Sequence, residues 1–149
     1  SLDLVIVGAF MGRGKRTGKY GTLLVATCNK NGQYETLCKV GSGFTENDLD
    51  NFPKILDKHK IKNKDISVFS MVKADIWFKP SVVIEIIGDE FTLSPIHTTG
   101  FNMVKPNNGL AVRFPRFTGK WRFDKSAIES TSQSEILQMY KKQFDFKQK

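Results

Sequence analysis

The sequence predicts a mainly β fold, a small closed barrel of about five strands with one inserted helix and a C-terminal amphipathic helix. Three observations lead to this prediction. Strand-like runs of Val, Ile, Leu and Phe follow one another at irregular spacing, one segment of helical periodicity interrupts them, and a helix-capping pattern precedes the last apolar residues. With 149 residues, 40% of them hydrophobic, the chain suits one domain with its own core.

The first three strands are expected in the N-terminal part of the chain. The apolar run Leu2–Phe10 predicts a strand, and the Gly-rich segment Met11–Gly21 predicts a flexible loop. Residues 22–40 have the pattern of a β-hairpin whose two-residue turn is Asn31-Gly32.

That turn sets the register of the hairpin. It pairs Val25 with Cys38 and Cys28 with Glu35, and it directs Lys39 outward. The two cysteines then lie on opposite faces of the ladder. We therefore expect no disulfide and a reduced, intracellular protein.

The inserted helix is expected directly after the hairpin. Thr45 and Asp48 have the spacing of an N-terminal cap. Apolar residues follow at helical spacing, namely Leu49, Phe52, Ile55 and Leu56. Pro53 should divide or kink this segment.

Two further strands are expected in the second half. Ser81–Leu93 predicts one long strand bent near Gly88, and Gly109–Phe117 predicts a last strand that ends near Pro115. This order of strands and helix suits a barrel of the OB type, and an open α+β sheet is the alternative.

A C-terminal helix completes the prediction. Ser132 and Glu135 form a capping box, and helical spacing relates the apolar residues Ile136, Met139, Tyr140 and Phe144. We therefore divide the chain into an OB-fold domain at residues 1–130 and a helix with its tail at residues 131–149.

The charge of the chain favours a polyanionic partner. The net charge is +8 and the pI is about 9.5, which fits nucleic acid, although a basic protein without such a partner has the same composition. No apolar run reaches the roughly 20 residues of a membrane span, and neither a signal peptide nor zinc-ligand spacing is visible. The chain begins at Ser1 with a strand-like run, as in an excised fragment or a processed product.

The segment Met11–Gly21 contains four cations and no acid: Arg13, Lys15, Arg16 and Lys19. Its glycines permit a close approach of backbone to ligand, but their spacing matches neither the P-loop nor the dinucleotide fingerprint. Such a loop suits phosphates along a nucleic-acid backbone. An exposed basic loop without a partner is the equal alternative.

A second basic centre, "RFPRFTGKWRFDK", mixes cations with aromatic residues. We expect Phe114 and Phe123 to be core residues that the cations cover. For Phe117, beside Arg116 at the predicted strand end, a surface role in stacking or wedging is favoured.

Four stretches, in this order, resemble the C-terminal OB-fold domain of ATP-dependent DNA ligases, closest to the archaeal and eukaryotic replicative type. They are "LDLVIVGAFMGRGKRTGKYG", "CKVGSGFT", "VVIEIIGDEFTLSPIHT" and "RFPRFTGKWRFDK". The resemblance implies sealing of nicks in duplex DNA during replication and repair, with ATP and Mg²⁺ as cofactors. It also implies a nucleophilic lysine in a K-x-D-G motif of a separate adenylation domain. This sequence contains no K-x-D-G, so we expect the chain to be inactive alone.

The resemblance assigns the R-x-D-K motif of the family to Arg122, Phe123, Asp124 and Lys125. Arg122 and Lys125 would hold the β- and γ-phosphates of ATP during lysine adenylation, and Asp124 would orient them or the metal. In the alternative, Asp124 is only their salt-bridge partner. In either case we expect Asp124 to be ionised. No metal ligand is assigned within this chain.

DNA contacts follow from the same resemblance. The basic loop would bind the DNA backbone through Arg13, Lys15, Arg16 and Lys19. Arg116 and Phe117 would press on the minor groove beside the nick. The expected partners are nicked double-stranded DNA, the adenylation domain of the same polypeptide, and a sliding clamp reached through domains outside this chain.

Two other functions stay open. One is a non-catalytic OB module that binds single-stranded nucleic acid, and the other is a translational OB protein that binds structured RNA. Asp124 between two cations favours the ligase, because a simple binder does not need an acid there. His97 is expected to be a loop histidine with a local hydrogen bond. The family implies a cytoplasmic or nucleoid location in an archaeon and a nuclear one in a eukaryote.

Overall fold

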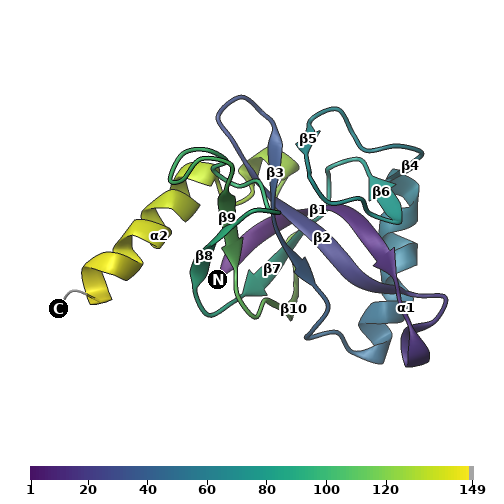
Figure 1. Ribbon diagram of the computed structural model, residues 1–149. Coiled ribbons are helices and arrows are strands. Elements are labelled where there is room, and N and C mark those ends of the chain that lie inside the picture. Colours follow the sequence, from purple (N-terminus) through teal and green to yellow (C-terminus); the bar gives the residue numbers. More distant parts are fainter. Residues whose placement is uncertain (148–149) are drawn as a thin grey trace.

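The computed structural model describes residues 1–147, which form a curled β-sheet and two α-helices (Figure 1). The strands are β1 (Leu2–Met11), β2 (Tyr20–Cys28), β3 (Tyr34–Val40), β4 (Lys60–Ile61), β5 (Val68–Phe69), β6 (Ile76–Phe78), β7 (Val83–Ile87), β8 (Phe91–Ser94), β9 (Gly109–Val112) and β10 (Arg116–Trp121). The helices are α1 (Glu46–Leu56) and α2 (Gln133–Lys147), and 3-10 helices cover Gly14–Arg16, Asp57–His59 and Ala127–Glu129. The predicted mainly β class with an inserted and a C-terminal helix is confirmed. The last two residues of the predicted tail, 148 and 149, lie outside the described residues.

The main sheet curls around the core as a partial barrel. Its strand order is β10-β7-β1-β2-β3-β5, and β8 and β9 form a second, two-stranded sheet. The N–H groups of Thr98 and Thr99 both donate to the carbonyl of Thr36 in β3 at 3.0 Å. The N–H of Leu110 in β9 donates to the carbonyl of Thr99 at 2.8 Å, so the curl continues from β3 to β9.

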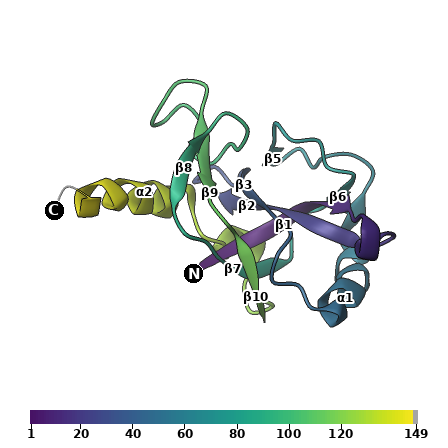
Figure 2. The ribbon, with the colours of Figure 1, turned by 60° about the horizontal axis from the view of Figure 1, so that its bottom comes forward.

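The two long strands predicted in the second half are each broken once. The first is divided into β7 and β8 at residues 88–90, and the second into β9 and β10 at residues 113–115. The strand that begins at Gly109 does end before Pro115, at Val112, but the prediction that it is the last strand is wrong, because β10 follows. Figure 2 shows β9 leading into β10. The expected strands correspond to β1, β2, β3 and the two broken strands. The short strands β4, β5 and β6, between α1 and β7, also belong to the main sheet and were not predicted, so the expected count of five is not confirmed.

The two breaks face each other across the sheet. The N–H of Arg113 donates to the carbonyl of Glu90 at 2.8 Å, and the N–H of Asp89 donates to the carbonyl of Arg113 at 2.9 Å. A Cβ on Gly88 would lie 2.4 Å from Val112 Cγ2, so the close approach of the two chains requires glycine there.

The hairpin of β2 and β3 differs from the predicted register in its outer half. Val25 pairs with Cys38 as predicted, but a bulge follows, so Cys28 pairs with Tyr34 and not with Glu35. The turn spans residues 29–33, because the Asn29 side chain accepts hydrogen bonds from two backbone N–H groups of the turn. The cysteines are free and buried, in different apolar clusters, as expected for opposite faces.

Helix α1 begins with the predicted cap. The N–H of Asp48 donates to Thr45 Oγ1 at 3.0 Å, and the N–H of Thr45 donates to Asp48 Oδ2 at 2.9 Å. Pro53 does not divide the segment, since the helix continues from Glu46 to Leu56. Its Leu49, Phe52 and Leu56 are buried against the strands of the main core.

Helix α2 packs on the barrel through its first turns and projects away from it (Figures 1 and 2). Ile136 and Tyr140 are buried in the same core cluster as Leu2 and Leu4 of β1. The Ser132 and Glu135 cap is formed, with the N–H of Glu135 donating to Ser132 Oγ at 3.1 Å. None of the described helices is long and apolar enough to cross a membrane.

Candidate phosphate and nucleic-acid interfaces

The R-x-D-K residues follow β10 and form an ion cluster with the start of β1. Arg122 donates through Nε and Nη2 to the two carboxylate oxygens of Asp124, at 3.0 and 2.9 Å. Its Nη1 donates to both oxygens of Asp3 at 3.0 Å. Lys125 Nζ donates to Asp3 Oδ2 at 2.8 Å. Two cations and two carboxylates thus balance one another, and Asp3 joins both cations.

The members of this cluster differ in exposure. The side chains of Arg122 and Asp3 are 18% and 17% exposed, whereas that of Asp124 is 65% exposed. Hydrogen bonds from Arg122 lower the pKa of Asp124 from 3.8 to about 2, and the same bonds raise the pKa of Arg122. Asp124 is therefore ionised near neutral pH, as its position between two cations led us to expect.

A hollow of about 450 Å³ lies beside the cluster. Arg122 and Lys125 line it together with Lys58 and His59 of the 3-10 helix after α1. Burial, with a contribution from Lys58, lowers the pKa of His59 and favours its neutral form. Three cations from two separate segments thus face one space, a composition that suits an anion.

The basic loop, residues 11–21, begins where β1 ends. The N–H of Gly12 donates to the carbonyl of Lys19 at 2.8 Å and closes the loop. Arg13 and Lys15 are exposed, and neither forms an ion pair with any described residue. These two side chains are available to phosphates.

The other two cations of the basic loop have partners within the protein. Arg16 donates through Nη1 to the carbonyls of Gly21 and Gly41, at 2.9 and 2.7 Å, and its guanidinium lies 5.5 Å from the centre of the Phe44 ring. Lys19 pairs with Asp50 of α1 at 2.8 Å. The sequence did not distinguish these two cations from their exposed neighbours.

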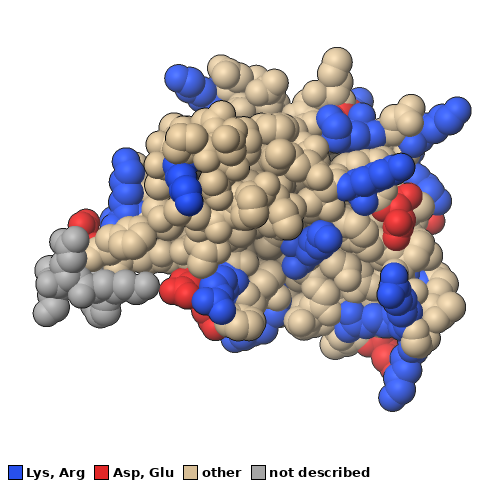
Figure 3. All heavy atoms as spheres, in the orientation of Figure 1, with Lys and Arg blue, Asp and Glu red and all other residues tan. Residues whose placement is uncertain are grey.

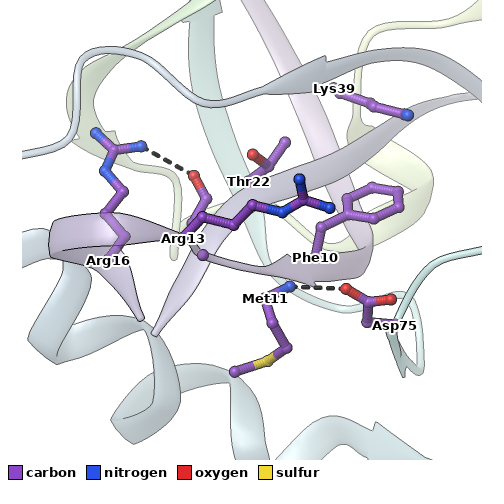
Figure 4. Close-up of a pocket in the computed structure, with 9 residues that line it drawn as sticks. Phe10, Met11, Arg13, Arg16, Thr22, Lys39 and Asp75 are labelled. Atoms are coloured by element: carbon purple, nitrogen blue, oxygen red, sulfur yellow. Dashed lines mark hydrogen bonds between the residues drawn. The ribbon is translucent and has the colours of Figure 1, made fainter. Parts of the chain in front are cut away.

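A hollow of about 500 Å³ lies beside the basic loop (Figure 4). Arg13 and Lys39 both reach toward Phe10 in this hollow, and the Lys39 amine lies 4.7 Å from the centre of the Phe10 ring. Asp75 is also at its edge and accepts a hydrogen bond of 2.9 Å from the Met11 N–H. Lys39 points outward, as predicted.

The aromatic residues of the second basic centre are arranged opposite to expectation. Phe117 is 3% exposed and packs in the core against Phe44 and Trp121, so the predicted surface position is wrong. Phe114 and Phe123, expected in the core, are 64% and 68% exposed. For Phe114 and Phe117 the reason is the break before β10: Phe114 has a φ of 53°, which interrupts the alternation of faces and turns Phe117 inward. Phe123 lies after the end of β10, where its ring stacks on that of Trp121 at 5.6 Å.

Arg116 is exposed at the start of β10, where it pairs with Ile87 of β7. The N–H of Phe117 donates to the carbonyl of Ser42, and the adjacent Gly41 carbonyl accepts from Arg16. The segment between β3 and α1 thus connects β10 to the basic loop. In Figure 3, Lys and Arg side chains are numerous toward the end of the molecule where β1 leads into β2.

The ion cluster and the basic loop lie at opposite ends of β1, which contacts them through Asp3 and Met11 (Figure 1). At about 3.3 Å per residue, the strand between them spans roughly 26 Å. Both regions are therefore connected through one strand, whose pairing with β2 shifts register between Ile6 and Gly8 and between Phe10 and Met11.

Several residues of these surfaces were missed in the sequence. Asp3, Lys58, His59 and Phe114 gave no local signal, because each acquires its role from partners distant in the chain or from a broken strand. His97 lies in a loop, as expected, but its ring bond is not local: Nδ1 lies 3.1 Å from Oγ1 of Thr36, which is 61 positions away, and burial lowers the pKa of His97 to about 4. Within residues 1–147, no group of His, Cys, Asp or Glu side chains is arranged to hold a metal ion.

Comparison with known proteins identifies a family. The family model described as the C-terminal region of ATP-dependent DNA ligase matches residues 16–125. The chain is 52% identical over 144 residues to DNA ligase 2 of Thermofilum pendens, covering 96% of this chain and 24% of that protein. It is 51% identical to the DNA ligase of Thermoplasma volcanium, with the same coverage. The chain thus spans about a quarter of the length of these curated relatives.

Solved structures agree with the fold. The ligase domain of Mycobacterium tuberculosis LigD superposes with a TM-score of 0.65 at 22% sequence identity, covering 87% of this chain and 37% of that one. A mycobacterial DNA ligase D complexed with ATP and MES gives a TM-score of 0.62, also at 22% identity, covering 88% of this chain and 37% of that one. At this identity the likeness concerns the fold alone, and it supports the OB-type barrel.

Proposed function

Because the chain belongs to the family of the C-terminal region of ATP-dependent DNA ligases, we propose that it serves in nick sealing with two separate surfaces. The ion cluster at the start of β1 faces the phosphates of ATP during lysine adenylation. The basic loop at the far end of β1 faces DNA. The observation that carries this proposal is the placement of two groups of Arg and Lys side chains at opposite ends of one strand, one paired with carboxylates and one exposed.

The first role is stabilisation of the leaving group. The ε-amine of a lysine outside this chain attacks the α-phosphorus of ATP, the bond to the β-phosphate oxygen breaks, and pyrophosphate leaves. Arg122 and Lys125 stabilise the charge that grows on pyrophosphate, and Asp124 orients Arg122 through its two bonds. This sequence contains no K-x-D-G motif, so this chain alone transfers no AMP.

The described residues do not themselves fit a resident Mg²⁺. The carboxylates of the ion cluster, Asp3 and Asp124, are both paired with cations, and a metal would have to displace Arg122 or Lys125 to reach them. We therefore propose that this chain contributes to ATP through its Arg and Lys side chains, without a metal ligand of its own.

The second role is contact with the DNA backbone and the nick. Arg13 and Lys15 are exposed and bind phosphates, and Arg116, exposed at the start of β10, makes a further phosphate contact. Phe114, which is exposed beside Arg113, makes the aromatic contact with DNA that was expected of Phe117. Phe117 instead supports this surface from the core.

The two surfaces lie at opposite ends of β1. We propose that the domain rotates between steps, presenting the ion cluster to ATP first and the basic loop to DNA afterwards. Sealing of a pre-adenylated nick needs only the second surface.

The test compares two variants in a full-length ligase that carries this chain as its C-terminal domain. Asp124→Ala should slow lysine adenylation more than sealing of a pre-adenylated nick. Arg13→Ala with Lys15→Ala should do the reverse and reduce the slope of log affinity against log salt by about 2, because about 0.9 counterion is released per phosphate contact. Equal loss in both steps from both variants would contradict the division of roles.

A further inference from the structure

The carboxylate of Asp3 has the most constrained position in the ion cluster. The Asp3 N–H donates to Thr131 Oγ1 at 2.9 Å, and the Thr131 N–H donates to the Asp3 carbonyl at 2.7 Å. On its other side, Asp3 pairs with Glu85 in the ladder of β1 and β7. Its backbone is therefore fixed from two directions, and its side chain is 17% exposed.

This fixed carboxylate is shared by both cations of the motif. Arg122 and Lys125 lie on a loop after β10, and each has a bond to Asp3 of 3.0 or 2.8 Å. Asp124 contacts Arg122 but makes no hydrogen bond to Lys125 within the described residues. Besides the backbone bond from the Lys125 N–H to the Arg122 carbonyl at 3.1 Å, Asp3 is thus the carboxylate among the described residues that bonds the side chains of both cations.

We propose, on the basis of the function above, that Asp3 is a positioning residue for lysine adenylation: it holds Arg122 and Lys125 as one rigid pair for the phosphates of ATP. The bonds within the cluster leave one N–H of Arg122 and two of Lys125 for a further acceptor. The hollow beside them is lined by both cations. A phosphate chain can bind there while Asp3 stays in place, so Asp3 acts through the cations without touching ATP.

Asp3 could instead compete with the phosphates of ATP for the two cations. In that case, removing Asp3 would have the opposite effect on ATP binding. The cluster has no net charge, and removing the carboxylate would make it positive. If charge alone mattered, the loss of Asp3 would tighten ATP binding. If position matters, the loss of Asp3 releases both cations from their alignment, and misplaced groups reduce the rate on the order of 10- to 100-fold.

The test measures single-turnover adenylation in a full-length ligase carrying this chain, as transfer of labelled AMP to the enzyme over a range of ATP concentrations. For Asp3→Asn we expect a maximal rate lower by about 10- to 100-fold, with sealing of pre-adenylated nicks within about twofold of wild type. The matched control is Glu85→Gln, which removes the neighbouring negative charge on β7 without touching either cation; it should adenylate like wild type.

Two outcomes would overturn the proposal. One is an Asp3→Asn enzyme that adenylates as fast as wild type, and the other is one that reaches half-maximal rate at a lower ATP concentration without loss of maximal rate. Arg122→Ala, run in parallel, separates this failure from that of the proposed function. If Arg122→Ala also adenylates normally, the assignment of the motif is wrong; if only Asp3→Asn is normal, Asp3 does not position the cations.

A folding defect is tested separately, since Asp3 is partly buried. If the Tm of Asp3→Asn falls and both reaction steps are lost, Asp3→Glu replaces it, because this variant keeps the charge and moves the carboxylate by one methylene. Slow adenylation with intact sealing in Asp3→Glu supports positioning. Unchanged adenylation in Asp3→Glu contradicts it.

Discussion

The ion cluster and the basic loop both present Arg and Lys at an end of β1, but their cations have different partners. In the ion cluster, Arg122 and Lys125 are fixed by two carboxylates and the whole has no net charge. In the basic loop, Arg13 and Lys15 are exposed without an ion pair among the described residues, and Arg16 and Lys19 hold the loop in place. The same residue types thus serve alignment in one region and attraction in the other.

The difference corresponds to what each step requires. Stabilising a leaving group depends on donors held at fixed positions, because alignment lowers the barrier only if it exists before the reaction. Binding a DNA backbone depends on charge and counterion release, which tolerate mobile side chains. We therefore expect the ion cluster to be sensitive to geometry and the basic loop to be sensitive to salt.

The largest expected effect is that of Arg122 on adenylation in the full-length ligase. Arg122→Ala should slow AMP transfer by about 100- to 1000-fold, the usual cost of removing one donor that stabilises developing charge. Arg122→Lys keeps the charge but cannot bond both Asp3 and Asp124 through a planar fork, so it should recover little. If Arg122→Lys restored the rate, charge and not geometry would govern the cluster, and the comparison would fail.

A smaller effect should divide the basic loop itself. Arg16→Ala removes two hydrogen bonds to the carbonyls of Gly21 and Gly41 and should lower stability by about 2 kcal/mol, or the Tm by about 5 °C. Lys15→Ala, the control, should leave the Tm unchanged and weaken DNA binding. Thermal unfolding of the two variants measures the difference, and equal Tm values would show that Arg16 does not hold the loop.

The smallest effect concerns the pKa values of two carboxylates. Asp124 belongs to the ion cluster, and Asp50 pairs with Lys19 of the basic loop. Arg122 holds the pKa of Asp124 at about 2, below 3.8, so the stability of that pair is complete above about pH 3.8 and is lost as pH falls through about 2. Lys19 also lowers the pKa of Asp50, through one bond between exposed groups. In carboxyl NMR titrations, Arg122→Ala should return the pKa of Asp124 toward 3.8.

The same NMR titration, repeated at higher salt concentration, compares how strongly salt changes the pKa values of Asp50 and Asp124. Added NaCl should move the pKa of Asp50 toward its ordinary value more than that of Asp124, because Asp124 is held by two directed bonds from a largely buried guanidinium. Equal salt sensitivity of the two carboxylates would mean that the ion cluster is no more rigid than the surface pair.

Local patterns in the sequence were sufficient for much of the fold. The Thr45 cap, the apolar run of β1 and the helical spacing of Leu49 and Phe52 depend on neighbours within a few residues, and all appear as predicted. The hairpin was predicted in the correct place, but its outer register was wrong, because Asn29 organises a larger turn than Asn31-Gly32 would form.

The aromatic residues of the second basic centre were misassigned for a different reason. The prediction treated 109–117 as one strand and judged Phe114 and Phe117 by their neighbours in that strand. The positive φ of Phe114 breaks the alternation, which places Phe114 outside and Phe117 inside. A single residue in a left-handed conformation thus reversed the predicted exposure of both Phe114 and Phe117. The sequence has no glycine at this position that would have indicated such a conformation.

By itself the sequence determined the class of fold, the two helix caps, the free cysteines on opposite faces and the resemblance to a ligase domain, since these follow from short-range spacing and from matched stretches. Only the tertiary structure decided which cations are fixed and which are available. Asp3 lies 119 positions from Arg122 and 122 from Lys125, and their contact depends on the registers that bring β1 and β10 to the two sides of β7. In the sequence Arg13 and Arg16 have the same chemistry; what separates them is whether a carbonyl oxygen lies within hydrogen-bonding distance.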